Sequence, residues 1–465
     1  HFPEWMCGAG ILALKTLAPA MGTVFTTHAT VLGRALCGNG IDIYARMAEI
    51  SPSQEASRFN VVAKCSMETV RAREADIFTT VSGITAEEAR YFLGRQPDIV
   101  TTNGLDLSAI LDYSKERELA KKNRASLMAP VNKLLRRDLP EDTRIFICSG
   151  RYEHHNKGVD LFIDALAKAK ETLKGSGKKV LALMLMMGGH TGPDANAVNG
   201  EASVHADAAH PEYGFLTSHK LYGAEHDPIL TTCRRLGLNN TADDPVQVLF
   251  VPAMLDGKDG FLNMPYFDVL SSGDLGVFPS WYEPWGYTPL ESIAFGVPTI
   301  TTTLAGFGKW VDEMDGAHKG VLVLTRNDGN SAHVIESIAD AIERYSRMGA
   351  KEYAECCNSA LEVAHTVRWG ELVRYYNDAY GVALDRVVTR TNKAVYDGGS
   401  IGEQVNFVRQ QLVSSTPNWS RVMVEKSLPK RLHALEELSK NLWWSWTMDA
   451  VELFESIDPA LWITC

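Results

Sequence analysis

The sequence lacks the cysteine patterns that hold disulfide-rich or zinc-binding proteins together. Its 465 residues include eight cysteines but no CxxC pair, and only Cys356 and Cys357 are neighbours. Most of the others lie in apolar segments that read as strands or helices. This usage argues against a disulfide framework and a zinc site, and it is typical of a reduced protein. We therefore predict no metal centre and a cytoplasmic location.

Long basic runs and long apolar runs are also missing. The formal net charge is −11 and no extended Lys/Arg run occurs, so we do not expect nucleic acid or an anionic membrane surface as a partner. The longest apolar stretch, Val180–Met187, is far shorter than the roughly 20 residues that span a bilayer. Over the whole sequence, 45% of the residues are hydrophobic and 22% are charged. This is the ordinary composition of a globular enzyme.

Length and periodicity predict more than one α/β domain. A chain of 465 residues exceeds one compact core, so we expect two to three domains. Strand-like runs alternate with helical patterns, which is typical of parallel sheets. The expected strands are 23–27, 76–81 and 98–102 in a first series, then 144–149, 180–187, 246–251, 275–279 and 299–302. We predict two Rossmann-like domains facing a cleft, plus a helical C-terminal tail.

Changes in composition set the expected boundaries. The first Rossmann-like domain should cover 1–140, and the second 141–350 with a His-, Gly- and Ala-rich insertion at about 188–228. Helical segments over 351–390 would close it, and the polar stretch 391–424 reads as a linker. Residues 425–465 have leucines at helical spacing and three close tryptophans, and they look like the start of another domain. The alternative for this last part is an amphipathic helix that forms a homo-oligomer.

The segment FPSWYEPWGYTPLESIAFGVP, Phe278–Pro298, carries the strongest chemical signal. Glu283 and Glu291 lie eight residues apart across an expected strand-to-helix turn. A carboxylate at a strand end, followed by the N–H groups of a new helix, can hold a sugar hydroxyl and a phosphate side by side. The structural alternative is a capping box with Thr288 as N-cap and Glu291 at N3. Glu283 and the clustered aromatic residues favour a sugar-nucleotide site.

The strands of the first series end in similar polar tails. TTHAT, TTVSG and TTNGL place His28, Ser82 and Asn103 after three strands, where ligands of open α/β sheets gather. A single histidine at a strand end is more often structural than functional. A helix is expected to begin after Thr85 as N-cap, with Glu88 at N3.

Together these motifs resemble the glycogen synthase family of the animal and fungal type, in its bacterial branch. The matching segments, in the family's order over about residues 1–385, are FTTHATVLGRALC, DIFTTVSGIT, PDIVTTNGLD, GRYEHHNKGVD, PSWYEPWGYTPLE and RWGELVRYY. The resemblance implies a GT-B fold and a retaining transfer of glucose from a nucleotide sugar to the 4-hydroxyl at a glucan's non-reducing end. It implies UDP-glucose as donor, with ADP-glucose as the alternative, glycogen or maltodextrin as acceptor, and no cofactor.

The resemblance also implies roles for single residues. Arg151 and Lys157 match the basic pair on the donor diphosphate, where they would neutralise charge on the leaving nucleotide. His28 matches the histidine near the glucosyl group, and Glu283 the carboxylate that would stabilise an oxocarbenium-like centre. The other matches concern the donor: Arg34 with phosphate, Glu291 with ribose, the backbone of Trp285, Gly286, Tyr287 and Thr288 with phosphate and sugar, and Tyr266 with the base. A core role for Tyr266 is the alternative.

Some features depart from the family pattern. The Gly-rich donor loop should lie upstream of His1, and Pro3 in HFPEW stands where the family usually has histidine, which leaves the role of Glu4 open. The arginine-rich regulatory helix is not matched, so we do not expect control by glucose 6-phosphate. Because the chain begins at His1 without an initiator methionine and ends after an apolar stretch, we expect the natural protein to be longer.

The tail adds a second resemblance. LPKRLHALEELSKNLWWSWTMDAVELFESIDPALW is similar to the opening of bacterial α-glucan phosphorylases of the maltodextrin type, which suggests a synthase–phosphorylase fusion. Pyridoxal phosphate would belong only to the phosphorylase part absent from this chain. Two alternatives stay open for the whole: a glucan-binding or regulatory part that is inactive as this fragment, and another retaining GT-B glucosyltransferase that makes a disaccharide.

Overall fold

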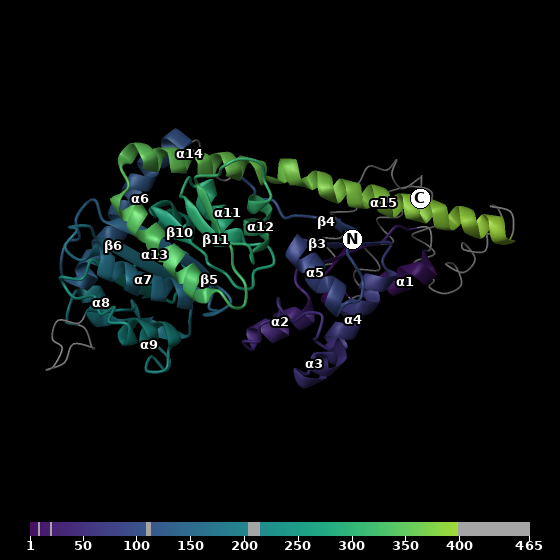
Figure 1. Cartoon of the computed structure of the whole chain (residues 1–465), viewed down its shortest axis with the longest axis horizontal. Helices are drawn as coiled ribbons and strands as arrows, with labels where there is room; N and C mark the ends of the chain where they lie inside the picture. Colours follow the sequence, from purple (N-terminus) through teal and green to yellow (C-terminus); the bar gives the residue numbers. More distant parts are fainter. Residues whose placement is uncertain (8–9, 19–20, 108–112, 203–213, 399–465) are drawn as a thin grey trace, which may run out of the picture.

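The computed structural model describes residues 1–7, 10–18, 21–107, 113–202 and 214–398, and it contains two all-parallel sheets (Figure 1). The smaller sheet has the order β1 (Phe2–Pro3), β2 (Val24–Thr27), β3 (Ile77–Thr80), β4 (Ile99–Val100). The larger has the order β12 (Val321–Leu324), β11 (Thr299–Thr302), β10 (Leu275–Val277), β5 (Arg144–Arg151), β6 (Val180–Met187), β9 (Val246–Val251).

These two sheets confirm the predicted α/β fold with two Rossmann-like domains, the GT-B arrangement. The strands at 180–187, 246–251 and 299–302 have the predicted bounds. The first two are mostly apolar, as is typical of strands covered by helices on both faces, and the third is the β-branched run TITT. Two strands of these sheets escaped prediction. β1 has only two residues, and β12 has the apolar sequence VLVL but only four residues.

Helices of the first domain surround β2 and β3, and a stacked pair of Phe25 and Phe78 fills the space beneath them with ring centroids 5.6 Å apart. These helices are α1 (Gly10–Leu17), α2 (Val31–Gly38), α3 (Pro52–Arg58), α4 (Val62–Glu74) and α5 (Gly83–Phe92).

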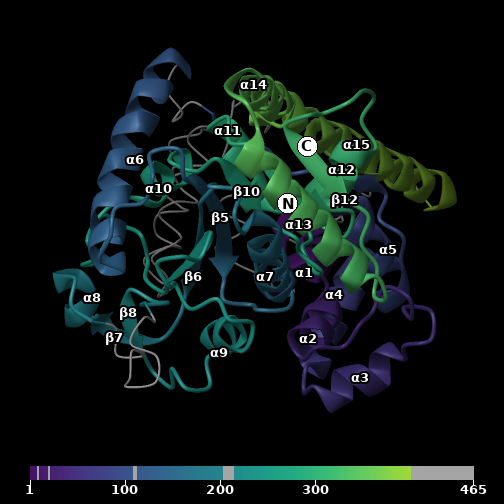
Figure 2. The same cartoon turned by 60° about the vertical axis from the view of Figure 1, so that its left-hand side comes forward.

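The larger sheet is covered on both faces, as Figure 2 shows. One face carries α7 (Val159–Leu173), α9 (Pro228–Arg235) and α13 (Ser331–Arg347); the other carries α6 (Tyr113–Leu135) and α10 (Tyr266–Ser271). Around β10–β12 lie α11 (Tyr287–Ala294), α12 (Gly306–Asp312) and α14 (Ala350–Thr366). We expected the first domain to reach residue 140, but Leu127, Val131 and Leu134 of α6 pack in the core of the second.

The long helix α15 (Trp369–Gly398) returns to the first domain after α14 (Figure 1). Ala379 and Ala383 pack against β2 and β3, and the Arg386 guanidinium pairs with Asp98 at 2.8 Å. Both domains are therefore joined by a second crossing of the chain. The helix continues through 391–398, the start of the stretch we predicted as a linker; the rest of that linker and the predicted domain start at 425–465 lie outside the described residues.

The insertion after β6 forms a short antiparallel pair, β7 (His190–Pro193) with β8 (His219–Leu221), and the small helix α8 (Ala195–Asn199). Within the described ranges, no three His, Cys, Asp or Glu side chains gather as a metal would require. In the same ranges, no helix is both long and apolar enough to cross a membrane.

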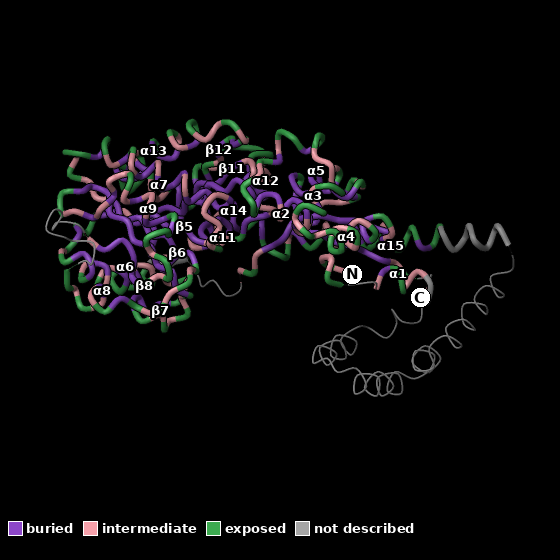
Figure 3. The backbone as a smooth tube through the Cα atoms, turned by 90° about the horizontal axis from the view of Figure 1, so that it is seen from below, coloured by how far each residue is buried: buried purple, intermediate pink, exposed green. Residues whose placement is uncertain are grey.

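Buried side chains from both domains meet in one cluster. Ala29, Leu32 and Leu36 of the first domain pack with Trp281 and Tyr282, which follow β10 in the second. Figure 3 shows buried backbone in the centre of each domain and exposed segments on the outer helices. The loop after β10 is therefore one of the segments through which the second domain touches the first.

Candidate active site

Two predicted residues meet at the carboxyl ends of neighbouring strands. β5 and β10 pair in parallel, so the loops that follow them lie side by side. Lys157 comes from the loop after β5 and Glu283 from the loop after β10, and the Lys157 ammonium pairs with the Glu283 carboxylate. Their side chains are only 10% and 14% exposed, so this ion pair is largely removed from bulk water.

Gly158 permits this approach. It is the N-cap of α7 with φ +68°, and a Cβ on it would lie 2.1 Å from the carbonyl oxygen of Pro279. Any larger residue would be strained at this φ and would also push the two loops apart. The glycine that bounds the motif GRYEHHNKG thus places Lys157 against the loop that carries Glu283.

Arg151, the other member of the predicted basic pair, lies apart from this contact. Its side chain is 56% exposed and its Nε lies 2.9 Å from the carboxylate of Glu153 in the same loop. The structure therefore brings Lys157 to Glu283 and leaves Arg151 on the open side of the loop.

The capping-box alternative for Glu291 is wrong. The N-cap of α11 is Gly286, with φ +109°, and the helix begins at Tyr287, so Thr288 lies inside the first turn. Glycine at this position supplies the positive φ that lets the helix start two residues early. The Glu291 carboxylate instead accepts a hydrogen bond from the Tyr266 hydroxyl at 3.1 Å, and burial raises its pKa.

Tyr266 connects Glu291 to β5. Its hydroxyl lies 2.9 Å from the Ser149 hydroxyl, and its ring is half-buried at the start of α10. Its ring packs against the core of the second domain, which agrees with the alternative role, while its hydroxyl links two polar groups at the sheet edge. Burial raises the pKa of this phenol, and the neighbouring Glu291 raises it further.

The loop that leads into α11 is held by backbone and aromatic contacts. Gly306 N–H donates to the Glu283 carbonyl at 3.0 Å, and Phe307 N–H donates to the Trp285 carbonyl at 2.8 Å. The Trp285 ring is buried against Phe307 and Trp310. Tyr287 is 42% exposed. Because the first N–H groups of a helix have no partner within it, this turn presents donors beside Glu283.

The first domain contributes His28, at the end of β2. Its Nδ1 lies 2.8 Å from the Glu4 carboxylate, and its backbone N–H donates to the same oxygen at 3.2 Å. Glu4 follows the neighbouring strand β1, has φ +60°, and accepts a hydrogen bond at its carbonyl from Arg71. The sequence left the role of Glu4 open because Pro3 stands where the family usually has histidine. The strand before Glu4, β1, has only two residues and gave no further signal.

Arg34 lies on the exposed side of α2, one turn after the N-cap Thr30, whose hydroxyl accepts from Gly33 N–H at 2.9 Å. Among the described residues, its guanidinium has no salt bridge or hydrogen bond. A free cation on the first turns of a helix beside His28 suits a phosphate.

Two buried carboxylates support this loop from below. Glu68 accepts from the Thr27 hydroxyl at 2.6 Å and from Val31 N–H at 2.9 Å, whereas Glu88 accepts from Thr30 N–H at 3.1 Å and from the Thr30 hydroxyl. Burial raises the pKa of each to about 7. The expected N3 role of Glu88 is wrong, because α5 starts earlier, with Ser82 as its N-cap.

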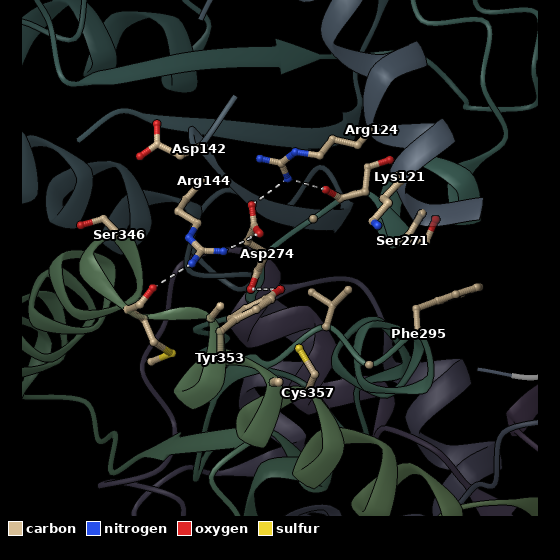
Figure 4. Close-up of a pocket in the computed structure, with 18 of the residues that line it drawn as sticks. Lys121, Arg124, Asp142, Arg144, Ser271, Asp274, Phe295, Ser346, Tyr353 and Cys357 are labelled. Carbon is tan, nitrogen blue, oxygen red and sulfur yellow. Dashed lines mark hydrogen bonds and ion pairs between the residues drawn. The ribbon is translucent and has the colours of Figure 1, made fainter. Parts of the chain in front are cut away.

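A hollow lies at the opposite edge of the six-stranded sheet, where β5 begins (Figure 4). It has a volume of about 710 Å³. Asp274 pairs there with Arg124 at 2.8 Å and Arg144 at 3.0 Å, and Lys178 pairs with Asp142 at 2.9 Å. None of the predicted site residues lines it.

Sequence comparisons identify the family of the chain. Residues 1–210 and 208–440 match the glycogen synthase family, and residues 428–465 match a family of proteins of unknown function. The chain is similar to the glycogen [starch] synthase of Caenorhabditis elegans, 28% identical over 476 residues that cover 89% of this chain and 70% of that protein. It is 29% identical to the glycogen [starch] synthase isoform 2 of Saccharomyces cerevisiae, and the alignment covers 83% of this chain and 64% of the yeast protein.

The liver glycogen [starch] synthase of Mus musculus is 30% identical, covering 83% of this chain and 62% of its own. The chain thus spans less than two thirds of the yeast and mouse relatives. Two solved structures are similar at low identity. The glycosyltransferase WaaG is 13% identical with a TM-score of 0.45, covering 78% of this chain and 76% of its own. The N-terminal domain of Candida albicans trehalose-6-phosphate phosphatase is 10% identical with a TM-score of 0.48, covering 82% and 70%. Because the family match extends over most of its length, the chain belongs to the glycogen synthase family.

Proposed function

We propose that this protein is a retaining glucosyltransferase that elongates an α-1,4-glucan from a nucleotide-glucose donor, with UDP-glucose as the donor and glycogen as the acceptor. The observation that carries the proposal is the buried Lys157–Glu283 pair at the carboxyl ends of β5 and β10. The free N–H groups of α11 lie beside it, and His28 with Glu4 comes from the other domain. This set offers a cation and amide donors to phosphate and a carboxylate to a sugar.

Each residue has a distinct part in the proposed reaction. Lys157 and Arg151 stabilise the negative charge that develops on the departing diphosphate, as preorganised donors do in a site shielded from water. Arg34 approaches the same phosphates from the first domain. Glu291 and Tyr266 hold the nucleoside: the Glu291 carboxylate binds the ribose, and the Tyr266 ring stacks on the base. His28, oriented by Glu4, donates or accepts at a glucosyl hydroxyl.

Retention would follow from reaction on one face of the sugar. Retaining glycosidases use two carboxyl groups about 5 Å apart, one of which becomes a covalent nucleophile. Glu283 has a lysine ammonium rather than a second carboxyl as its hydrogen-bonded partner. In the proposed reaction the leaving phosphate oxygen takes the proton of the acceptor hydroxyl, and Glu283 stabilises positive charge at the anomeric carbon.

The test measures incorporation of labelled glucose into glycogen from UDP-glucose and ADP-glucose side by side. We expect transfer from UDP-glucose, with product digestible as α-1,4-glucan, and loss of most activity in Lys157→Ala. Glu336→Gln, at the exposed Lys168–Glu336 pair on the surface, is the control that should retain activity. Glycogen binding without transfer from either donor would contradict the proposal and support a glucan-binding module instead.

A further inference from the structure

Glu88 is a buried carboxylate for which the proposed reaction gives no role. It lies on α5 of the first domain, and only 1% of its surface is exposed. Its Oε1 accepts hydrogen bonds from Thr30 N–H and from the hydroxyls of Thr30 and Tyr282. Within the described residues it forms no salt bridge. Burying a carboxylate without a cation is costly, so a purely structural position would be filled more stably by an uncharged side chain.

The first turn of α2 is shaped around this carboxylate. A Cβ on Gly33 would lie 2.1 Å from Glu88 Oε1 and 2.9 Å from the Thr30 hydroxyl. Glycine therefore lets Glu88 reach the turn that begins between His28 and Arg34. Any movement of Glu88 would displace this turn, because Thr30 holds it with both its backbone and its side chain.

The third donor comes from the other domain. Tyr282 follows β10 and directly precedes Glu283, and its hydroxyl donates to Glu88 at 3.1 Å. Its neighbour Trp281 donates through Nε1 to Asp328 at 2.9 Å, and Asp328 also accepts from Ala45 N–H of the first domain at 2.8 Å. Two consecutive residues before Glu283 are thus tied to the first domain.

We propose that Glu88 is a positioning residue that fixes Glu283 relative to His28 and Arg34 through its hydrogen bond with Tyr282. The inference rests on the proposed function, because the positioned groups are the two halves of the glucosyl site. Glu88 touches no substrate in this assignment. It acts by joining the turn at Thr30 to the segment that ends in Glu283, so that the catalytic carboxylate is placed correctly only when the domains are closed.

The titration of Glu88 supports this role. Burial raises its pKa to about 7, and the hydrogen bonds and Arg34 oppose that rise. Below pH 7 the protonated carboxyl is a weaker acceptor for the Tyr282 hydroxyl. The groups whose charge or pKa is coupled to Glu88 are Arg34 and Cys37 on α2, Tyr44 after α2, Glu68 on α4 and Tyr282 after β10.

The test is a double-mutant cycle of Tyr282→Phe and Glu88→Gln, read by kcat, KM and thermal unfolding. Tyr282→Phe keeps the ring in the apolar cluster and removes only the inter-domain donor. We expect kcat to fall about tenfold with KM changed less than about twofold, and the double variant to be no slower than the slower single variant, since both changes act on one interaction. We also expect the fall in kcat between pH 8 and 6 to be smaller in Glu88→Gln than in the unmodified protein.

Two matched cycles serve as controls. Glu68→Gln removes an equally buried carboxylate that has no described contact with the second domain, and Tyr353→Phe removes a tyrosine hydroxyl that donates within the second domain at 3.2 Å. The effects of Glu68→Gln and Tyr282→Phe on kcat and stability should be additive. The effects of Tyr353→Phe and Glu88→Gln should be additive as well. Additive effects of Tyr282→Phe and Glu88→Gln, or an unchanged kcat in Tyr282→Phe, overturn the inference.

Failure of the proposed function gives a different result. If the unmodified protein transfers no glucose from either donor, the proposed function is wrong. The contact is then judged by the unfolding cycle alone. In that cycle, non-additive effects of Glu88→Gln and Tyr282→Phe on stability support the hydrogen bond between the two residues as an inter-domain contact. Additive effects overturn that contact.

Discussion

The two edges of the six-stranded sheet use the same types of charge in opposite ways. At the amino edge, Asp274 accepts from Arg124, Arg144 and Ile145 N–H, so the two guanidinium groups share one carboxylate (Figure 4). Around the carboxyl edge, Glu291 is partly buried and Glu88, on the facing domain, fully buried, both without a described salt bridge, while Arg34 and Arg151 are exposed.

This difference separates a structural charge network from a functional one. Opposite charges that satisfy each other at a fixed distance stabilise the fold and leave nothing to offer a ligand. Buried acids without cations cost stability. Exposed cations leave binding capacity: Arg34 has no described partner, and Arg151 pairs only with Glu153 of its own loop. Glu283 combines both situations, because Lys157 neutralises it and, in the proposed reaction, also meets the donor phosphate.

The largest expected effect is on catalysis at the carboxyl edge. Glu283→Gln keeps the size and the hydrogen-bonding capacity of the side chain and removes its charge. We expect glucosyl transfer to fall roughly 1,000-fold, the scale of losing one preorganised electrostatic group, with little change in melting temperature. Steady-state assay and differential scanning fluorimetry of one preparation measure both. A variant that retains more than a tenth of the activity would remove Glu283 from the reaction.

At the amino edge we expect the reverse. Asp274→Asn leaves Arg124 and Arg144 without their shared anion and should lower the free energy of unfolding by about 3 kcal/mol, as when one partner of a buried ion pair is removed. The kcat of the folded variant should stay within about threefold, because the hollow lies across the sheet from Glu283. Denaturant titration and the transfer assay read the two quantities. A large loss of kcat with intact stability would erase the contrast between the edges.

The pH dependence of stability sharpens the comparison. Burial raises the pKa of both Glu68 and Glu88 from 4.5 to about 7, so the folded protein binds these protons more tightly than the unfolded chain does. Their contribution to stability is therefore fully present below pH 4.5 and is lost as the pH rises through 7, by up to about 3 kcal/mol for each group.

Thermal unfolding between pH 5 and 8 measures this loss. Glu88→Gln should gain stability relative to the unmodified protein as the pH rises, although its kcat is the lower of the two throughout. A difference in stability that does not change with pH would show that Glu88 does not titrate in this range.

The smallest expected effect concerns Tyr266. Tyr266→Phe removes the hydroxyl that links Glu291 to Ser149 and keeps the ring. We expect the KM for the nucleotide sugar to rise about tenfold with little change in kcat, since one hydrogen bond to a charged group contributes about 1.5 kcal/mol. Ser149→Ala is the companion variant and should have a weaker effect. An unchanged KM in both would leave Tyr266 a core residue.

Local pattern was a good guide wherever a segment is buried on both sides. β6 and β9 have the predicted bounds because a mostly apolar run permits only one assignment, and β11 because its residues are all β-branched. Helix starts were less predictable. Ser82 and Thr85 are both good N-caps, and Thr288 is a better N-cap than Gly286 by residue type. The choice was made by contacts far along the chain, such as Gly306 with the Glu283 carbonyl.

The sequence by itself determined the family, the order of the strands along the chain and the presence of Glu283, Lys157 and His28 at strand ends, because short-range periodicity and long motifs carry that information. Only the tertiary structure decided that Lys157 pairs with Glu283, that Glu4 orients His28 and that Glu88 meets Tyr282. These pairs are separated by 126, 24 and 194 positions. Their contact follows from strand order and domain packing, which no local pattern encodes.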